Sequence, residues 1–391
     1  MAQAENTVKI TSVLSLEKSE NFIIKRSFNG SLLNHNNLGL AWQGVFVLKC
    51  KPQDNIAIVT EPQFIQIYQH NAADVALELL QGLSALQAYT SPKYLYDALG
   101  SRLFEAITEL PEYDLTRTEA ALMHQHSKDM AACLPRAACW IDLGAGNCEK
   151  AGRLLGPMNV ARYVAVDISV DFVRQALATL QRQHPSVRMA GLGTDFSGGL
   201  ELPEALALDP AQARVLFYPG SSIGNFTPSQ ALEFLSSLHR ACGNLRTGQK
   251  AVHSNAASSG LLIGVDLVKD AAQLEAAYDD ALGVTAAFNL NLLRHINRLL
   301  GSDFALRDWR HLSRFDRVHS RIEMHLQARH ACTVTWQGSQ RSFAAGETIH
   351  TENAYKWTVA GFTAHLQAAG FAPGHVWTDS AERFAVFWAP A

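Results

Sequence analysis

The stretch CWIDLGAGNCE, residues 139–149, decides the fold of this chain. It begins as an apolar strand, turns at Gly144 and Gly146, and continues into a helical segment. Glycines at such a turn let the backbone bend sharply and approach a ligand, with the N-terminus of the next helix facing it. A dinucleotide-binding fingerprint needs a third glycine where Glu149 stands, so the pattern argues against an ordinary dehydrogenase.

The next two predicted strands end in residues that suit a nucleoside. RYVAVDIS (162–169) places Asp167 21 residues after Gly146, where a carboxylate can accept both hydroxyls of a ribose. The following strand ends in Asp195 and Phe196, a pair suited to binding an adenine amine and covering the ring. Taken alone, Asp167 is equally consistent with a solvated carboxylate at a strand end.

The three features together are more specific. D-x-G-x-G over residues 142–146, a carboxylate after the second strand and Asp-Phe after the third occur in this order. This set resembles the S-adenosylmethionine-dependent methyltransferases of the Rossmann-like class. The resemblance implies class I methyltransferase architecture, with S-adenosylmethionine bound at these turns.

The rest of the chain fits an α/β fold with a cap. From residue 139 onward predicted strands alternate with amphipathic helices, which implies a parallel sheet. The last two strands are typical of an antiparallel hairpin at the edge of such a sheet. Residues 268–356 interrupt the alternation, and such an insertion commonly covers the carboxyl edge, where ligands bind. We predict a seven-stranded Rossmann-like sheet over 118–267 and 357–391, and an α+β cap over 65–117 and 268–356.

Local patterns assign the elements of this cap. Helical spacing occurs in three segments of the insertion, 271–283, 288–304 and 306–315. Antiparallel strands are predicted for 320–338 and 340–351.

Composition excludes several functional classes. The chain has 391 residues, 48% of them hydrophobic, and 33 basic against 36 acidic residues give a net charge of −3. Without a basic patch, nucleic acid is not expected as a partner. We find no apolar run long enough to span a membrane and no signal peptide. The six cysteines form no C-x-x-C pair, so we expect reduced thiols in a cytoplasmic protein.

Residues 1–64 differ from the remainder. Short apolar runs alternate there with turn residues, which predicts a β-rich N-terminal extension. We find no catalytic pattern in this segment. We expect it to pack on the enzyme or on a second copy, and the second arrangement would give a homodimer through this extension.

Longer segments narrow the resemblance. Between residues 94 and 357 the chain contains, in this order, YLYDALGSRLFEAITELPEYDLTRTE, GNCEKAGRLL, GSSIGNFTP, DLVKD, AYDDALGVTAAFN, RIEMHLQA and HTENAYKW. Together they resemble the histidine Nα-methyltransferase family of ergothioneine biosynthesis, over roughly residues 91–391. That family also has relatives that act on other amino acids and on indole alkaloid precursors.

The resemblance implies an amino-acid pocket. Asn225 and Tyr278 stand where the family binds the substrate carboxylate, and Tyr96 where a tyrosine lies near the amino group. Methyl transfer from a sulfonium needs a neutral, aligned amine, so positioning in a water-poor pocket dominates catalysis. Alternatives remain for single residues, because Asn225 also suits a turn and the ring of Tyr278 also suits packing.

Four more positions match family residues. Tyr113 corresponds to a tyrosine beside the substrate ring, Met324 to a methionine of the same pocket, and Glu352 to a carboxylate facing an imidazole N–H. Lys150 corresponds to a lysine that helps hold the methionine end of the cofactor. A solvated charge at Glu352 or Lys150, and a core methionine at Met324, are the simpler alternatives.

Three features depart from the family pattern. Ala354 replaces a serine that hydrogen-bonds the imidazole, Tyr113 precedes Asp-Leu, and AVHSNAASSG (251–260) is an insertion. A pocket that lacks one buried hydrogen bond discriminates less well against other rings. Substrates other than histidine, such as another amino acid or an aromatic amine of a natural-product pathway, therefore stay open. A non-catalytic scaffold that binds S-adenosylmethionine is the third hypothesis.

We expect no metal centre. Asp279 and Asp280 are adjacent, but neither a histidine nor a third carboxylate has ligand spacing to them. We interpret the pair as cap or turn residues. The 15 histidines show no H-x-x-x-H spacing, which gives zinc catalysis no support.

Overall fold

The computed structural model describes residues 61–67, 71–243 and 259–391. Val59–Ala391 forms a compact unit of its own. The strands expected before residue 61, and most of the insertion at 251–260, lie outside the described residues. Among the described helices none has the length and apolar character needed to cross a membrane.

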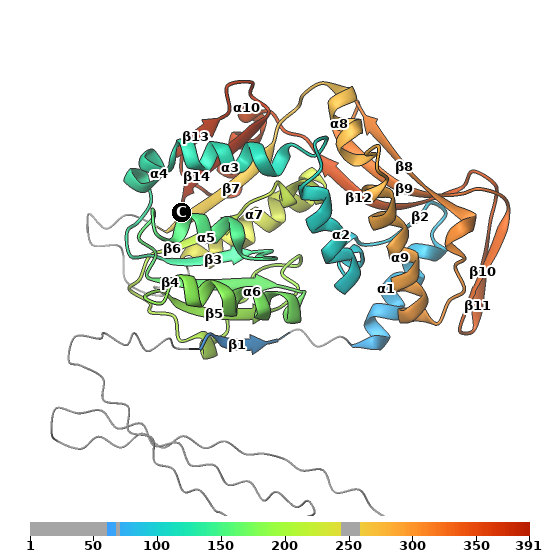
Figure 1. Ribbon diagram of the computed structural model, residues 1–391, viewed down its shortest axis with the longest axis horizontal. Helices are drawn as coiled ribbons and strands as arrows, with labels where there is room; N and C mark the ends of the chain where they lie inside the picture. The colour runs from blue at the N-terminus through green and yellow to red at the C-terminus, as the bar shows by residue number, and fades with distance from the viewer. Residues whose placement is uncertain (1–60, 68–70, 244–258) are drawn as a thin grey trace, which may run out of the picture. The chain divides into compact units, whose positions relative to one another are not determined.

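An eight-stranded sheet forms the centre of this unit (Figure 1). Its spatial order is β1 (Gln63–Gln66), β5 (Arg188–Gly193), β4 (Arg162–Asp167), β3 (Cys139–Leu143), β6 (Arg214–Tyr218), β7 (Gly260–Asp266), β14 (Phe384–Pro390) and β13 (His375–Thr378). The strands from β1 to β7 are parallel, β14 is antiparallel to β7, and β13 is antiparallel to β14. The predicted parallel sheet with an antiparallel terminal hairpin is confirmed.

The number of strands differs from our prediction of seven. β1 adds an eighth strand, pairing in parallel with β5 so that Phe64 lies opposite Gly191. The Phe64 ring occupies the space above that glycine, where an added Cβ would lie 2.2 Å from a ring atom. The Arg174 guanidinium covers the same ring at 4.5 Å from its centroid. The segment 55–69 has the apolar, β-branched pattern of a strand, but its pairing with a partner so distant in sequence leaves no local pattern to detect.

Helices cover both faces of the sheet because successive strand residues point to opposite sides. Trp140 belongs to the apolar cluster of one face and Ile141 to that of the other. The first face packs mainly against α3 (Leu115–Gln125), α5 (Glu149–Leu155) and α6 (Val170–Gln183). The second packs against α7 (Pro228–Gly243) and α10 (Val359–Ala368). The short helix α4 (Ser127–Cys133) follows α3.

A second sheet lies beside the first and forms the centre of the cap (Figure 1). Its order is β2 (Ala88–Tyr89), β12 (Thr348–Tyr355), β9 (Arg321–Ala328) and β8 (Trp309–Asp316). The cap also contains α1 (Ala72–Ser84), α2 (Ala98–Thr108), α8 (Ala271–Tyr278), α9 (Val284–Leu300) and the hairpin of β10 (Cys332–Trp336) with β11 (Ser339–Phe343). We keep the residue boundaries of the cap and of the extension as a proposal.

The helix predicted over 306–315 is wrong. Leu306–Asp308 forms one 3₁₀ turn, and the chain then continues as β8. Trp309 pairs with Ala328 and Asp316 with Arg321, so the whole strand is in register with β9. This long-range pairing outweighs the helix propensity of the Leu, Arg and His residues in the segment.

The interpretation of Asp280 as a cap residue is confirmed. Its carboxylate accepts hydrogen bonds from the backbone N–H groups of Val284 at 2.9 Å and Thr285 at 2.7 Å, in the first turn of α9. These bonds satisfy donors that the helix leaves unpaired and hold the pKa of Asp280 below its usual value, although burial acts in the opposite direction.

Candidate active site

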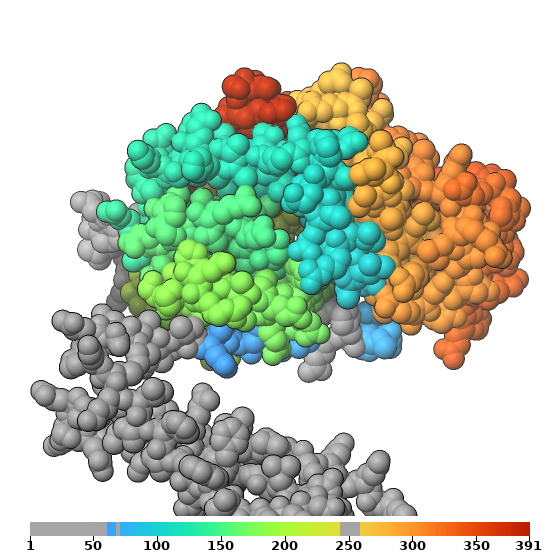
Figure 2. Space-filling model, in the orientation of Figure 1, coloured from blue at the N-terminus to red at the C-terminus, as the bar shows by residue number. Residues whose placement is uncertain are grey.

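A cavity of about 1920 Å³ lies where the cap meets the carboxyl edge of the large sheet. Loops after β3, β4, β5 and β6 line one side of it, and residues of α2, α3 and β12 line the other. On the face shown in Figure 2, the cyan segment that includes α2 lies between the green residues of the large sheet and the orange residues of the cap. The predicted location at the carboxyl edge is thus where the cavity lies.

The turn after β3 has the geometry expected from its glycines. Gly144 and Gly146 have φ values of +72° and +52°, which residues with a side chain rarely adopt. The N–H of Gly146 donates to Oδ2 of Asp167 at 3.0 Å, and the N–H of Ser169 donates to Oδ1 at 2.8 Å. Burial raises the pKa of Asp167, and these donors oppose the rise. The carboxylate is therefore held firmly at the cavity wall.

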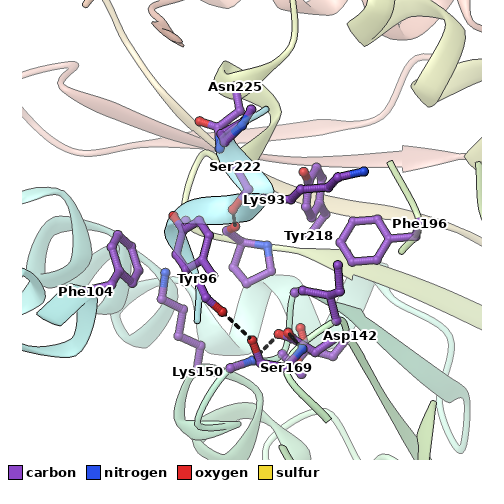
Figure 3. Close-up of a pocket in the computed structure, with 18 of the residues that line it drawn as sticks. Lys93, Tyr96, Phe104, Asp142, Lys150, Ser169, Phe196, Tyr218, Ser222 and Asn225 are labelled. Atoms are coloured by element: carbon purple, nitrogen blue, oxygen red, sulfur yellow. Dashed lines mark hydrogen bonds between the residues drawn. The ribbon is translucent and has the colours of Figure 1, made fainter. Parts of the chain in front are cut away.

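Asp195 and Phe196 line the cavity on the same side. Ser197 donates to Asp195 Oδ1 through its N–H at 3.0 Å and its hydroxyl at 2.6 Å. Lys93 Nζ lies 3.3 Å from Oδ2 of the same carboxylate. Burial acts to raise the pKa of Asp195, but Ser197 and Lys93 outweigh it and lower that pKa. In Figure 3 the rings of Phe196 and Tyr218 lie on one side of the cavity, with Tyr96 and Phe104 on the other.

Asp142 is a second buried carboxyl group at the cavity, and we did not predict it. Tyr163 donates to its Oδ2 at 2.6 Å, while Oδ1 has no hydrogen-bond partner among the described residues. Burial raises its pKa to about 7, although the Tyr163 hydrogen bond and the charge of Lys150 act against this. The only sequence signal for Asp142 was its place as the first residue of the D-x-G-x-G motif.

Lys150 is held by a residue that sequence reasoning also missed. Its Nζ lies 2.7 Å from Oε2 of Glu119, a side chain that is 1% exposed. Oε1 of Glu119 accepts the N–H of Gly220, after β6, at 2.7 Å. Glu119 therefore joins α3, α5 and the β6 loop around the cavity. It is the last residue of the long family segment that begins at Tyr94, which was the only sequence signal.

Three tyrosines and one glutamate gather on the cap side. Tyr96 and Tyr113 line the cavity, and the ring of Tyr278 contacts that of Tyr113 edge-on at 6.1 Å between centroids. Burial, together with the charge of Glu352, raises the pKa of all three phenols well above their usual value. The phenols therefore stay protonated and can donate hydrogen bonds.

Glu352 is the acidic member of this group. Its side chain projects from β12 to the cavity, the residue is 9% exposed, and Oε2 has no hydrogen-bond partner among the described residues. Burial raises its pKa to about 7, and the positive charge of Lys356 opposes the rise. A buried carboxyl oxygen without a donor is costly, so this position suits a ligand that carries an N–H group.

The remaining predicted residues divide into two groups. Asn225 lines the cavity from the 3₁₀ turn Ser222–Asn225, which packs against β12. Met324, Ala354 and Tyr278 do not line it: Met324 lies on β9 opposite Glu352, and Ala354 packs in a small apolar cluster with Tyr278 at its edge. These three residues form the layer behind the cavity wall.

Comparison with known proteins identifies the family. The family described as histidine-specific, S-adenosylmethionine-dependent methyltransferases matches residues 75–391. The chain belongs to this family. The resemblance found in the sequence is therefore confirmed, and the protein is an S-adenosylmethionine-dependent N-methyltransferase with a Rossmann-like fold.

Similar proteins occur in bacteria and fungi. The methyltransferase is 37% identical to a histidine N-alpha-methyltransferase of Mycolicibacterium smegmatis, over 82% of this chain and 97% of that one. It is 36% identical to a histidine N-alpha-methyltransferase of Mycobacterium tuberculosis, over 78% and 92%. An N-methyltransferase of Aspergillus flavus is 25% identical over 80% of this chain and 87% of its own.

The residues at the sheet edge of the methyltransferase fit S-adenosylmethionine. The glycine turn leaves room for close approach, since a Cβ on Gly144 would meet only Phe196, at 3.8 Å. The unpartnered Oδ1 of Asp142 can accept an N–H of the ligand. Asp167 and Asp195 supply acceptors for hydroxyl and amine groups, and Phe196 supplies an apolar wall.

Proposed function

We propose that this methyltransferase methylates the α-amino group of histidine or of an amino acid of similar shape. The observation that carries the proposal is the unpartnered Glu352 carboxyl oxygen, which faces the cavity beside protonated phenols and opposite the cofactor loops. An amino acid whose side chain carries an N–H group would satisfy that oxygen. Its carboxylate and amine would then lie towards Asn225 and Tyr96.

The protein's contribution to the reaction is mainly orientation. When bound, S-adenosylmethionine supplies a methyl group on a sulfonium: the amine lone pair forms the new N–C bond while the electron pair of the broken S–C bond stays on sulfur. The chain must present a neutral amine in line with that bond. We assign this alignment to Tyr96, Asn225, Tyr278 and Glu352. Tyr113 shapes the wall around the substrate side chain, and Met324 packs behind that wall.

The cofactor positions follow the same logic. We propose that Asp167 binds the ribose hydroxyls, that Asp195 and Phe196 bind the adenine, and that Gly144, Gly146 and Lys150 hold the methionine portion. Each of these residues lines the cavity. The hydrogen bonds that already fix Asp167 and Asp195 support the assignment, because they reduce the reorganisation that binding requires.

Another amine is the alternative substrate. Ala354 brings no hydroxyl to the group around Glu352, so a side chain with a single N–H donor or a cationic group competes with histidine more easily. A methyl-transfer assay across the twenty amino acids and several aromatic amines, read by product mass, decides between them. Preferred turnover of histidine supports the proposal, and preferred turnover of an amine without a carboxylate overturns it.

The same preparation tests the scaffold hypothesis. Isothermal titration with S-adenosylmethionine measures binding independently of turnover. Binding without methyl transfer to any of these amines would favour a scaffold over an enzyme for small molecules.

Assembly and compartment remain hypotheses. We propose a cytoplasmic protein that forms a homodimer through residues 1–64, which lie almost wholly outside the described residues. Static light scattering on the full chain gives the mass in solution. A monomer mass would overturn the dimer.

A further inference from the structure

Lys356 follows β12 and is the most deeply buried cation near the cavity that we find in the described part of the chain. Its side chain is 1% exposed. Its Nζ lies 2.8 Å from Oδ2 of Asp266, at the end of β7, and 3.3 Å from the hydroxyl oxygen of Tyr278. The lysine has no part in the proposed binding of substrate or cofactor, although a buried ammonium group is costly unless it is paired.

Asp266 pairs with two lysines rather than one. Its other oxygen, Oδ1, lies 2.7 Å from Nζ of Lys269, which is nearly buried as well. One of these cations is enough to neutralise the carboxylate. Lys269 alone is therefore enough to neutralise Asp266, so charge balance does not explain why Lys356 is buried beside the same carboxylate.

The hydrogen bond from Lys356 to Tyr278 offers an explanation for the buried lysine. An ammonium group has three N–H donors and no acceptor, so Lys356 donates and the Tyr278 oxygen must accept. The phenol hydrogen is then left to point elsewhere. Tyr278 itself lies behind the cavity wall, but its ring contacts that of Tyr113 and its phenol interacts with Glu352, and both of these residues line the cavity. The hydrogen is therefore free to turn toward that part of the wall.

We propose that Lys356 is a positioning residue that orients the Tyr278 hydroxyl to donate to the carboxylate of an amino-acid substrate. The inference rests on the proposed function, because it takes Tyr278 as a carboxylate-binding residue. Asp266 fixes the ammonium group, the ammonium group fixes the hydroxyl, and the hydroxyl selects substrates that carry a carboxylate.

Lys356→Met tests this, with Lys269→Met as the matched control. Both variants remove one cation from Asp266 and leave the other in place, but only the first removes the contact with Tyr278. The measurements are KM and kcat for the best amino-acid substrate, and the inhibition constant of the amine that corresponds to it without the carboxylate. The dissociation constant of S-adenosylmethionine, measured by titration, reports whether each variant is folded.

Lys356→Met should raise KM for the amino acid about tenfold or more, as expected when a hydrogen bond to a charged group is misaligned. The inhibition constant of the decarboxylated amine should change less than threefold, and Lys269→Met should change neither quantity by more than that. Equal losses for both ligands, or equal losses in both variants, would overturn the inference. If the unmodified protein methylates no amino acid, the proposed function fails first, which is a different result.

A pH profile separates the charge of Lys356 from its contact with Tyr278. Glu352 interacts electrostatically with Lys356, Tyr96, Tyr113 and Tyr278, and among these only the lysine is positively charged. Loss of that charge should shift the acid limb of kcat/KM upward by about one pH unit. The substrate amine has the same pKa in the assays of both proteins, so it does not contribute to the difference between their pH profiles. Lys356→Gln loses the charge but keeps an N–H donor for Tyr278, so it should shift the limb and yet keep KM within threefold of the unmodified protein. A KM raised as far in Lys356→Gln as in Lys356→Met would overturn the inference.

Discussion

The two sides of the cavity differ in how their polar groups are held. On the sheet side, Asp167 and Asp195 already accept hydrogen bonds from nearby backbone and side-chain donors. On the cap side, Glu352 has a buried oxygen without a donor, and its neighbours come from segments far apart in the sequence. Asp167 and Asp195 are therefore arranged before a ligand arrives, with Asp142 the exception on the sheet side because its Oδ1 has no partner among the described residues. On the cap side the acidic group itself is completed by the ligand. This difference places substrate specificity on the cap side.

The largest expected effect is on stability. The pKa of Glu352 is raised to about 7 by burial, so the folded protein loses stability as pH rises from about 4.5 through 7 and the carboxyl group ionises. Glu352→Gln cannot ionise and should gain up to about 3 kcal/mol over the unmodified protein above pH 7, and little at pH 4. Urea unfolding at both pH values measures this. The exposed Glu201→Gln serves as control, and an equal gain at both pH values would refute the assignment.

The next effect concerns turnover. Glu352→Gln should reduce kcat/KM for the amino-acid substrate by about 1.5–3 kcal/mol, roughly ten- to a hundredfold, because a charged acceptor is lost. The affinity for S-adenosylmethionine should stay unchanged, since Glu352 lies on the cap side. Steady-state kinetics and titration report the two quantities separately. A parallel loss of cofactor affinity would mean that the two sides are not independent.

Asp167→Ala makes the complementary test on the sheet side. We expect S-adenosylmethionine binding to weaken by about 1–3 kcal/mol, with KM for the amino acid changed little at saturating cofactor. Folding should be retained, because Asp167 lies at the cavity and not in the core. Titration calorimetry gives the affinity. Unchanged binding in this variant would show that the ribose lies elsewhere.

The smallest effect is expected at Ala354. Ala354→Ser should raise kcat/KM for histidine about two- to tenfold relative to a competing amine, the size of one neutral hydrogen bond. Ala354 packs beside Tyr278 in the layer behind the cavity wall, which limits what a hydroxyl can reach. Both proteins must be assayed with histidine and one other amine. A flat response would leave Ala354 as a packing residue only.

The same comparison explains what the sequence could predict. Gly144 and Gly146 follow β3 and Asp167 ends β4, and short-range spacing was enough to place them together. Glu119 and Lys93 were missed because their partners, Lys150 and Asp195, are distant in sequence and lie across the junction between helices and sheet. A contact between residues so far apart in the chain leaves no pattern in the residues around either of them.

Long-range pairing also limited the fold prediction. The alternation of strands and helices from residue 139 predicted the parallel sheet, because each strand and its helix are adjacent in the chain. β8 was predicted as a helix because its pairing with β9 is invisible in its own residues. For the same reason, the cap-side residues Tyr96, Tyr113 and Glu352 were found through resemblance to a family rather than through spacing.

The eighth strand has a consequence for how the chain can be shortened. β1 ends at Gln66, before residue 75, where the family match begins. A chain cut to the family boundary would leave the N–H and C=O groups of β5 open along a sheet edge, with Gly191 uncovered where Phe64 had packed. Open edges of this kind recruit strands from other molecules. Self-association of the shortened protein would then reflect a missing strand and not a natural oligomer.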